Sequence, residues 1–116
     1  MKNPTGIFVN AGDLLYFERA GGEWTGDKNN ASMDRGCGIS WADPFPEHTW
    51  RLPPEEGTAG GLIGYIGDQP FFIGCNPVEM VAPASGELYL GMNDCLQCFW
   101  DNGGVLYVNI KVTPGS

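Results

Sequence analysis

Apolar residues alternate with polar or small residues in two segments near the C-terminus of the chain. The entirely apolar alternate positions are Leu88, Leu90 and Met92 in the first segment, and Leu106, Val108, Ile110 and Val112 in the second. A period of two places one face of a strand in a core and the other face toward solvent. We therefore predict two β-strands, and we expect the segment between them, 93–104, to be a long hairpin connection.

Shorter apolar pieces precede these two strands and are separated by turn-forming residues. The 18 glycines and 9 prolines are spread along the chain, and no segment repeats its apolar residues at the spacing of a helical stripe. The pieces that we predict as strands are 6–9, 14–18, 62–66, 71–73 and 78–81. Many short strands with turns between them predict an all-β protein, with two antiparallel sheets packed as a β-sandwich or jelly roll. With 116 residues, the chain is expected to form a single domain, 1–116.

The segment 21–56 differs from the rest because it is polar, rich in glycine and proline, and contains Trp24, Trp41 and Trp50. A long stretch without regular structure inside a compact domain is usually functional or disordered. Three tryptophans argue against disorder, since disordered segments are poor in aromatic residues. We expect this segment to form ordered loops over one end of the sandwich.

The charge balance restricts the partners of the protein. Lys+Arg 6 against Asp+Glu 14 gives a net charge of −8, and proteins that bind nucleic acid need positive charge against the phosphates. No nucleic-acid partner is therefore expected. No apolar stretch reaches the roughly 20 residues of a membrane span, so no membrane insertion is expected either. Residues 1–4 lack the apolar run of a signal peptide, which predicts cytoplasmic synthesis, with any release to the extracellular surface by another route.

Four cysteines, Cys37, Cys75, Cys95 and Cys98, are compatible with several chemistries. An even count permits two disulfides, but a protein made without a signal peptide is expected to keep its thiols reduced. A zinc site would need four ligands, and a redox Cys-x-x-Cys motif would need a helix that the pattern lacks. We therefore expect ordinary buried or loop cysteines with reduced thiols.

Asp94, Asp101 and Asn102 stand near the two ends of the segment 93–104 and carry oxygen ligands. Calcium in proteins binds six to eight oxygens from carboxylates, amides, backbone carbonyls and water. If the flanking strands pair, the ends of the segment lie about 5 Å apart and these side chains can converge. Gly103 and Gly104 permit the turn that this requires. The same residues are common in ordinary hairpin turns, so the spacing alone leaves a calcium site and a plain turn open.

Several motifs occur in an order that resembles the PA-IL-type (PA-I galactophilic) calcium-dependent lectins of bacteria. They are Thr5-Gly6-Ile7, Gly61-Leu62-Ile63-Gly64, Gly86-x-Leu88-x-Leu90-x-x-Asn93-Asp94 and Asp101-Asn102-x-Gly104. The likeness runs from near Thr5 to the last strand. It implies a small jelly-roll sandwich of the galactose-binding-domain type that is not an enzyme. It further implies that the protein binds galactose-containing glycans through Ca²⁺ and forms a homo-oligomer, either a dimer or a tetramer.

The resemblance also implies roles for single residues. The calcium ligands would be the side chains of Asp94, Asp101 and Asn102 and the backbone carbonyls of Cys98 and Thr25. The sugar contacts would come from His48, Arg51, Asp94, Cys95 and Asp101, and the ring of Trp100 is a candidate stacking surface. Two positions depart from the family, since Asp101 stands where asparagine is usual and Arg51 stands where an amide is typical. The metal site would therefore be more anionic, and the sugar preference can differ.

Two other functions are alternatives to a lectin. Asp94 and Asp101 could be the acid and base of a small glycoside hydrolase, in which two carboxyl groups lie about 5–10 Å apart. The protein could also be a metal-independent β-sandwich interaction module whose acidic loop is only solvated. Turnover of a nitrophenyl galactoside would identify the hydrolase, and a melting temperature unaffected by a chelator would identify the module.

Overall fold

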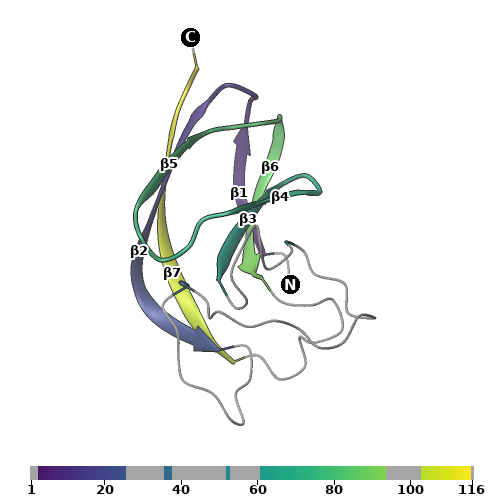
Figure 1. Ribbon diagram of the computed structural model, residues 1–116. Coiled ribbons are helices and arrows are strands. Elements are labelled where there is room, and N and C mark those ends of the chain that lie inside the picture. Colours follow the sequence, from purple (N-terminus) through teal and green to yellow (C-terminus); the bar gives the residue numbers. More distant parts are fainter. Residues whose placement is uncertain (1–2, 26–35, 38–51, 53–60, 94–102, 116) are drawn as a thin grey trace.

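Seven β-strands in two antiparallel sheets make up the fold of the computed structural model, which describes residues 3–25, 36–37, 52, 61–93 and 103–115 (Figure 1). The four-stranded sheet has the order β1-β6-β3-β4 and consists of β1 (Asn3–Val9), β6 (Gly86–Met92), β3 (Leu62–Ile66) and β4 (Gln69–Phe72). The three-stranded sheet has the order β5-β2-β7 and consists of β5 (Val78–Val81), β2 (Leu14–Thr25) and β7 (Gly103–Thr113). The described residues contain no helix, and hence none able to cross a membrane. The predicted all-β sandwich is confirmed.

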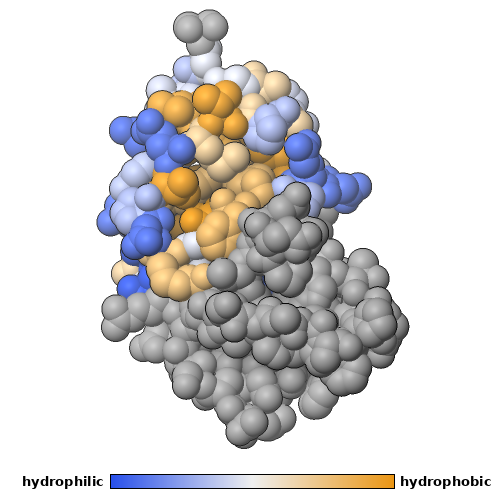
Figure 2. Space-filling model, in the orientation of Figure 1, coloured by the Kyte–Doolittle hydropathy of each residue, from blue (hydrophilic) through white to orange (hydrophobic). Residues whose placement is uncertain are grey.

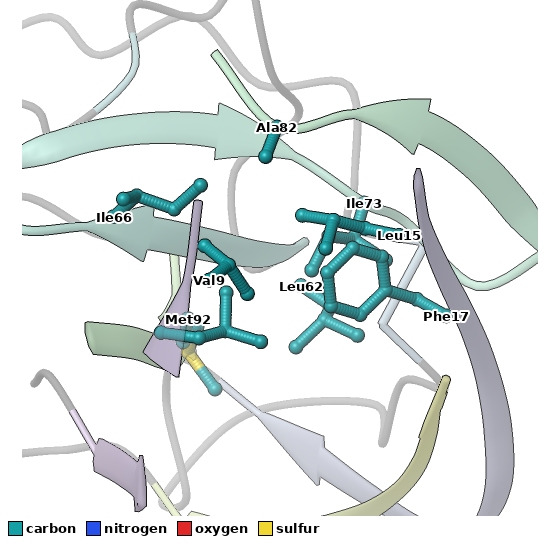
Figure 3. Packing of buried hydrophobic residues seen from close by; sticks show 9 residues of the cluster. Val9, Leu15, Phe17, Leu62, Ile66, Ile73, Ala82 and Met92 are labelled. Carbon is teal, nitrogen blue, oxygen red and sulfur yellow. The ribbon is translucent and has the colours of Figure 1, made fainter. Parts of the chain in front are cut away.

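The apolar faces of the two sheets meet in a common core (Figure 3). From β2, Leu15 and Phe17 contribute side chains without exposed surface, and the ring of Phe17 lies 5.9 Å from the ring of Phe71 in β4. The residues predicted to share apolar faces all pack in this core, namely Leu88, Leu90, Met92, Leu106, Val108, Ile110 and Val112. Figure 2 shows apolar residues between the sheets and hydrophilic residues along the margins of the same view. The prediction from the period of two is confirmed.

The last two strands do not pair with each other, so the prediction of a final hairpin is wrong. β6 pairs with β1 and β3 in the four-stranded sheet, whereas β7 pairs with β2 in the other sheet. The segment between β6 and β7 therefore connects one sheet to the other. Alternation specifies which face of a strand is buried, but it does not specify which strand lies beside it. In this sandwich, the apolar faces of β6 and β7 belong to opposite layers of the core.

β3 is buried on both faces, because Leu52 covers part of the outer face of the four-stranded sheet. Ile63 and Tyr65 form a second apolar cluster with Leu52, separate from the central core. Leu52 belongs to the segment 21–56, which we predicted to form loops. That prediction is wrong for 21–25, which complete β2. Apart from 36–37 and Leu52, the remainder of the segment, with Trp41 and Trp50, lies outside the described residues.

Cys37 and Cys75 form a disulfide, and their Cα atoms lie 4.5 Å apart. The prediction of reduced thiols is therefore wrong for this pair, whereas Cys95 and Cys98 lie outside the described residues. The two bonded cysteines are 38 positions apart in the sequence. A separation of this size carries no sign of which cysteines meet, and our expectation rested on the N-terminal residues instead of on the pair itself.

The carboxylate of Asp13, directly before β2, binds the backbone at two places. It accepts hydrogen bonds from the N–H groups of Asn10 at 2.8 Å and Gly115 at 3.0 Å. These bonds, that from Asn10 above all, hold the pKa of Asp13 below its ordinary value. The carboxyl of an unfolded chain titrates near pH 3.9. The carboxylate therefore stabilises the fold above that pH, and its contribution is lost as the pH falls through the lower pKa of the folded state.

We expect Asp13→Ala to lower the melting temperature by several degrees near neutral pH, because two N–H groups lose their acceptor. The difference from the wild-type protein should shrink as the pH falls below about 4 toward the lower pKa of the folded carboxylate, because the wild-type side chain then loses its charge. Thermal melts followed by circular dichroism at neutral and acidic pH would measure this. Asp68→Ala, which removes an exposed carboxylate from the turn after β3, is the matched control. A difference that stays constant through the acidic range would contradict the assignment.

Candidate functional site

The two ends of the sandwich differ in how the strands are connected. At one end, the described residues join strands by short turns at 10–13, 67–68 and 82–85 (Figure 1). At the other end, β2 and β6 finish and β3 and β7 begin, so the segments before and after them start or finish there. We call the first the turn end and the second the loop end. All residues predicted to bind calcium or sugar lie in or next to segments that adjoin the loop end.

Thr25 is the last residue of β2 and the one predicted calcium ligand that the described ranges include. Its Cα is the partner of the Cα of Gly103, the first residue of β7. Opposite residues in an antiparallel pair lie about 4.5–5.5 Å apart, so Thr25 lies beside the chain neighbour of Asn102. The other predicted site residues lie outside the described residues, namely His48, Arg51, Asp94, Cys95, Cys98, Trp100, Asp101 and Asn102. The described residues alone contain no group of three acidic, histidine or cysteine residues that could hold a metal ion.

A β-bulge bends β2 before the strand reaches Thr25. The register with β7 shifts between Arg19 and Gly21, and Gly22 adopts a φ of +86°. The guanidinium of Arg19 spans this irregularity, because its Nε and Nη2 donate to the carbonyl of Gly22 at 3.1 and 2.7 Å. Bulges bend a strand and are common beside functional sites. The glycine pair within a polar stretch is the available sign of the bulge, but the apolar pattern alone predicts this strand only over 14–18.

Asn93, the residue after β6, is a further feature of the loop end that the sequence analysis did not single out as functional. It is fully buried, and its side-chain Oδ1 accepts a hydrogen bond from the N–H of Leu52 at 3.0 Å. Its Nδ2 donates to the carbonyl of the same Leu52 at 3.1 Å. Its own N–H donates to the carbonyl of Gly61 at 2.8 Å. We call the paired bonds between the Asn93 amide and the Leu52 backbone the Asn93 clamp.

The clamp joins two parts of the chain that lie far apart in the sequence. Asn93 directly precedes Asp94, a predicted ligand of both metal and sugar, and Leu52 directly follows Arg51, a predicted sugar contact. The residues in the clamp are 41 positions apart. The covalent neighbours of two predicted site residues are thus held together by two hydrogen bonds.

Comparison with known proteins gives a match at the level of structure. No family model and no curated protein matches the sequence. A solved structure described as the EclA N-terminal domain, a PllA-like lectin, superposes with a TM-score of 0.68 and 21% sequence identity. The match covers 96% of this chain and 86% of that chain. The chain thus shares the two-sheet β-sandwich fold of that domain.

The loop end of the sandwich is also held by Gly36. Gly36 has a φ of +96°, and its carbonyl accepts a hydrogen bond from the N–H of Leu62 at 2.8 Å. A Cβ at this position would lie 2.9 Å from Cδ1 of Leu106 in β7 and 3.2 Å from Cβ of Leu62 in β3. Glycine is therefore the residue that fits between the two sheets here. The adjoining Cys37 is bonded to Cys75, which fixes this segment covalently as well.

Proposed function

We propose that the protein is a non-catalytic lectin that binds galactose-containing glycans through a calcium ion at the loop end. The observation that carries the proposal is the pairing of Thr25 with Gly103. It brings the backbone of one predicted ligand beside the chain neighbour of Asn102. The lectin-type fold supports carbohydrate binding in general. The motif resemblance supports the finer parts of the proposal, calcium and galactose.

The donor set suits calcium by its chemistry. Asp94, Asp101 and Asn102 would supply side-chain oxygens, and Cys98 and Thr25 would supply carbonyl oxygens, in line with the oxygen preference of Ca²⁺. Two carboxylates balance the charge of one divalent cation. When bound, calcium supplies open coordination positions for two vicinal hydroxyls of a sugar. The carboxylates of the chain accept the polarised protons of those hydroxyls, and such charge-assisted bonds are stronger than neutral ones.

The remaining residues would select the sugar. His48 and Arg51 are hydrogen-bond donors placed before the clamp, and Cys95 and Trp100 belong to the segment after it. The Trp100 ring suits the apolar face of a sugar, while the Arg51 guanidinium offers a planar fork of donors. A sugar with vicinal hydroxyls of the galactose stereochemistry would engage the metal and the donors together.

We expect the wild-type protein to bind galactose in calcium and to lose this binding in a chelator. Calorimetric titration with galactose in each buffer is the direct test, and a single site of modest affinity, with Kd about 0.1 mM, corresponds to roughly −5.5 kcal/mol. Mannose, whose hydroxyl stereochemistry differs, is the ligand control. No heat from galactose in either buffer would contradict the proposal. Turnover of a nitrophenyl galactoside would favour the hydrolase, and a melting temperature indifferent to calcium would favour the metal-independent module.

Two further parts of the proposal concern assembly and compartment. We infer a homo-oligomer from the resemblance, because several weak sites on one assembly raise the avidity for clustered glycans. The Cys37–Cys75 disulfide supports an oxidising compartment as the place where the protein acts, since disulfides are rare in reducing cytosol. Light scattering of the purified protein would test the first point, with a monomer mass as the contradicting result.

A further inference from the structure

The Asn93 amide is fully buried and both of its polar atoms bind one residue, Leu52. Buried amide groups are almost always hydrogen-bonded in proteins. Here the donor and the acceptor of the side chain match the carbonyl and the N–H of a single backbone unit, as a neighbouring strand would. Two bonds to one unit fix its orientation as well as its position.

Leu52 is anchored independently of this clamp. Its side chain is 8% exposed and packs in the second apolar cluster with Ile63 and Tyr65. Burial of the side chain keeps Leu52 on the outer face of the sheet, but an apolar contact has no direction. The two hydrogen bonds of the clamp are directional, and they set the orientation of the Leu52 backbone, which follows Arg51 in the chain.

The path of the chain into Asp94 depends less on the side chain of Asn93. The N–H of Asn93 donates to the carbonyl of Gly61, and this backbone bond is retained whatever side chain stands at position 93. The other side of the predicted metal site, the residues next to Gly103, is held by the pairing of β2 with β7. Loss of the amide therefore affects the side of Leu52 and Arg51 first.

We propose that Asn93 is a positioning residue that aligns the sugar-contact segment ending at Arg51 with the metal-binding loop starting at Asp94. The inference rests on the proposed function and deepens it. It assigns sugar affinity to the clamp, and calcium affinity to the Asn93–Gly61 backbone bond and the pairing of β2 with β7. Asn93 acts through Leu52, whose backbone N–H and carbonyl bind both polar atoms of its side chain. The consequence is a split: a change at Asn93 weakens galactose binding while calcium binding persists.

Two variants test the split, Asn93→Ala and Asn93→Leu. Both remove the clamp, and leucine has the branched shape of asparagine and leaves no cavity, so the pair separates lost hydrogen bonds from a cavity. We expect galactose affinity at saturating calcium to fall about tenfold in both, which corresponds to about 1.4 kcal/mol. Calcium affinity, titrated alone by calorimetry, should stay within about threefold of wild type.

The control is Asp13→Ala at the turn end, which also removes a side chain that binds the backbone twice. It should lose thermal stability and keep wild-type galactose affinity. Wild-type galactose affinity in both Asn93 variants, or equal losses of calcium and galactose affinity, would overturn the inference and leave the proposed function standing. A wild-type protein that binds neither ligand would overturn the proposed function itself.

A measurement on the wild-type protein keeps the inference open to refutation if both variants fail to fold. The N–H of Leu52 is the backbone donor of the clamp, so its hydrogen exchange should be slow in the calcium-loaded protein and slower still with galactose. Exchange of this amide at the rate of an unstructured peptide in the sugar-bound protein would overturn the inference.

Discussion

Asp94→Ala is expected to abolish the binding of both calcium and galactose. Asp94 is one of two predicted carboxylate ligands, so its loss removes half of the negative charge that balances the ion. We expect calcium affinity to fall by roughly 100-fold. Galactose binding should fall with it, because the proposed sugar site consists of the metal and the carboxylates behind it. Titration of the variant with calcium, and then with galactose at high calcium, measures both losses.

The matched control for Asp94→Ala is Asp68→Ala. It makes the same change in net charge in the turn between β3 and β4, at the turn end. We expect Asp68→Ala to bind both ligands as the wild type does, which separates a lost ligand from weaker general attraction of a chain with net charge −8 for cations. In a chelator, Asp94→Ala should melt at the wild-type temperature. If Asp94→Ala bound galactose normally, the assignment of the metal ligands would be wrong.

The sequence predicted the fold well because a sandwich depends mainly on which faces of its strands are apolar. The alternation of Leu88 to Met92 and of Leu106 to Val112 identified inward faces that the structure confirms. The assignment of strands to sheets was not predictable in the same way. β6 and β7 would have the same apolar pattern whether they paired side by side or faced each other across a core. The hairpin was predicted because the two strands are consecutive in the sequence, whereas in the structure they belong to different sheets.

The candidate site likewise has one part that the sequence could predict and one part that it could not. The resemblance named Thr25 as a backbone ligand, and strand pairing places it opposite Gly103, the residue after Asn102. The supports of the site escaped prediction because each depends on contacts between distant segments. In the sequence alone, an asparagine beside an aspartate is typical of a turn. The role of Asn93 becomes visible only from its hydrogen bonds to Leu52. The hydrogen bonds from the Arg19 guanidinium to the carbonyl of Gly22 likewise have no sign in the sequence apart from the adjacent glycines, Gly21 and Gly22.

The Cys37–Cys75 disulfide lies beside another contact between segments that are distant in the sequence. The backbone of Leu62, at the start of β3, makes three hydrogen bonds. Its N–H donates to the carbonyl of Gly36, and its carbonyl accepts from the N–H groups of Ile73 and Gly74. The distances are 2.8, 2.9 and 2.9 Å. Since Cys37 follows Gly36 and Cys75 follows Gly74, the backbone bonds already bring the two cysteines together. The covalent bond therefore closes a contact that the fold itself forms.

Replacing both bonded cysteines, as Cys37→Ser with Cys75→Ser, is expected to lower the free energy of unfolding by about 4 kcal/mol. This is the chain-entropy estimate for a cross-link between residues 38 positions apart. Typical domains have only about 5–15 kcal/mol in total, so the variant should be marginal at physiological temperature. Its melting temperature should fall by roughly 15 °C or more. Urea unfolding of the wild-type and doubly substituted proteins at one temperature measures the difference directly.

The paired substitution is a sharper test than a reducing agent, because it removes the Cys37–Cys75 cross-link and adds no reagent to the solution. Alkylation of the unfolded wild-type protein followed by mass spectrometry should show Cys37 and Cys75 blocked to the reagent before reduction and reactive afterwards. Since the hydrogen bonds around Leu62 remain in the double variant, the sheets should keep their pairing, and the loss should come mainly from the unfolded chain. An unchanged urea midpoint would mean that the cross-link does not restrict the unfolded chain, and reactive thiols before reduction would mean that it does not form.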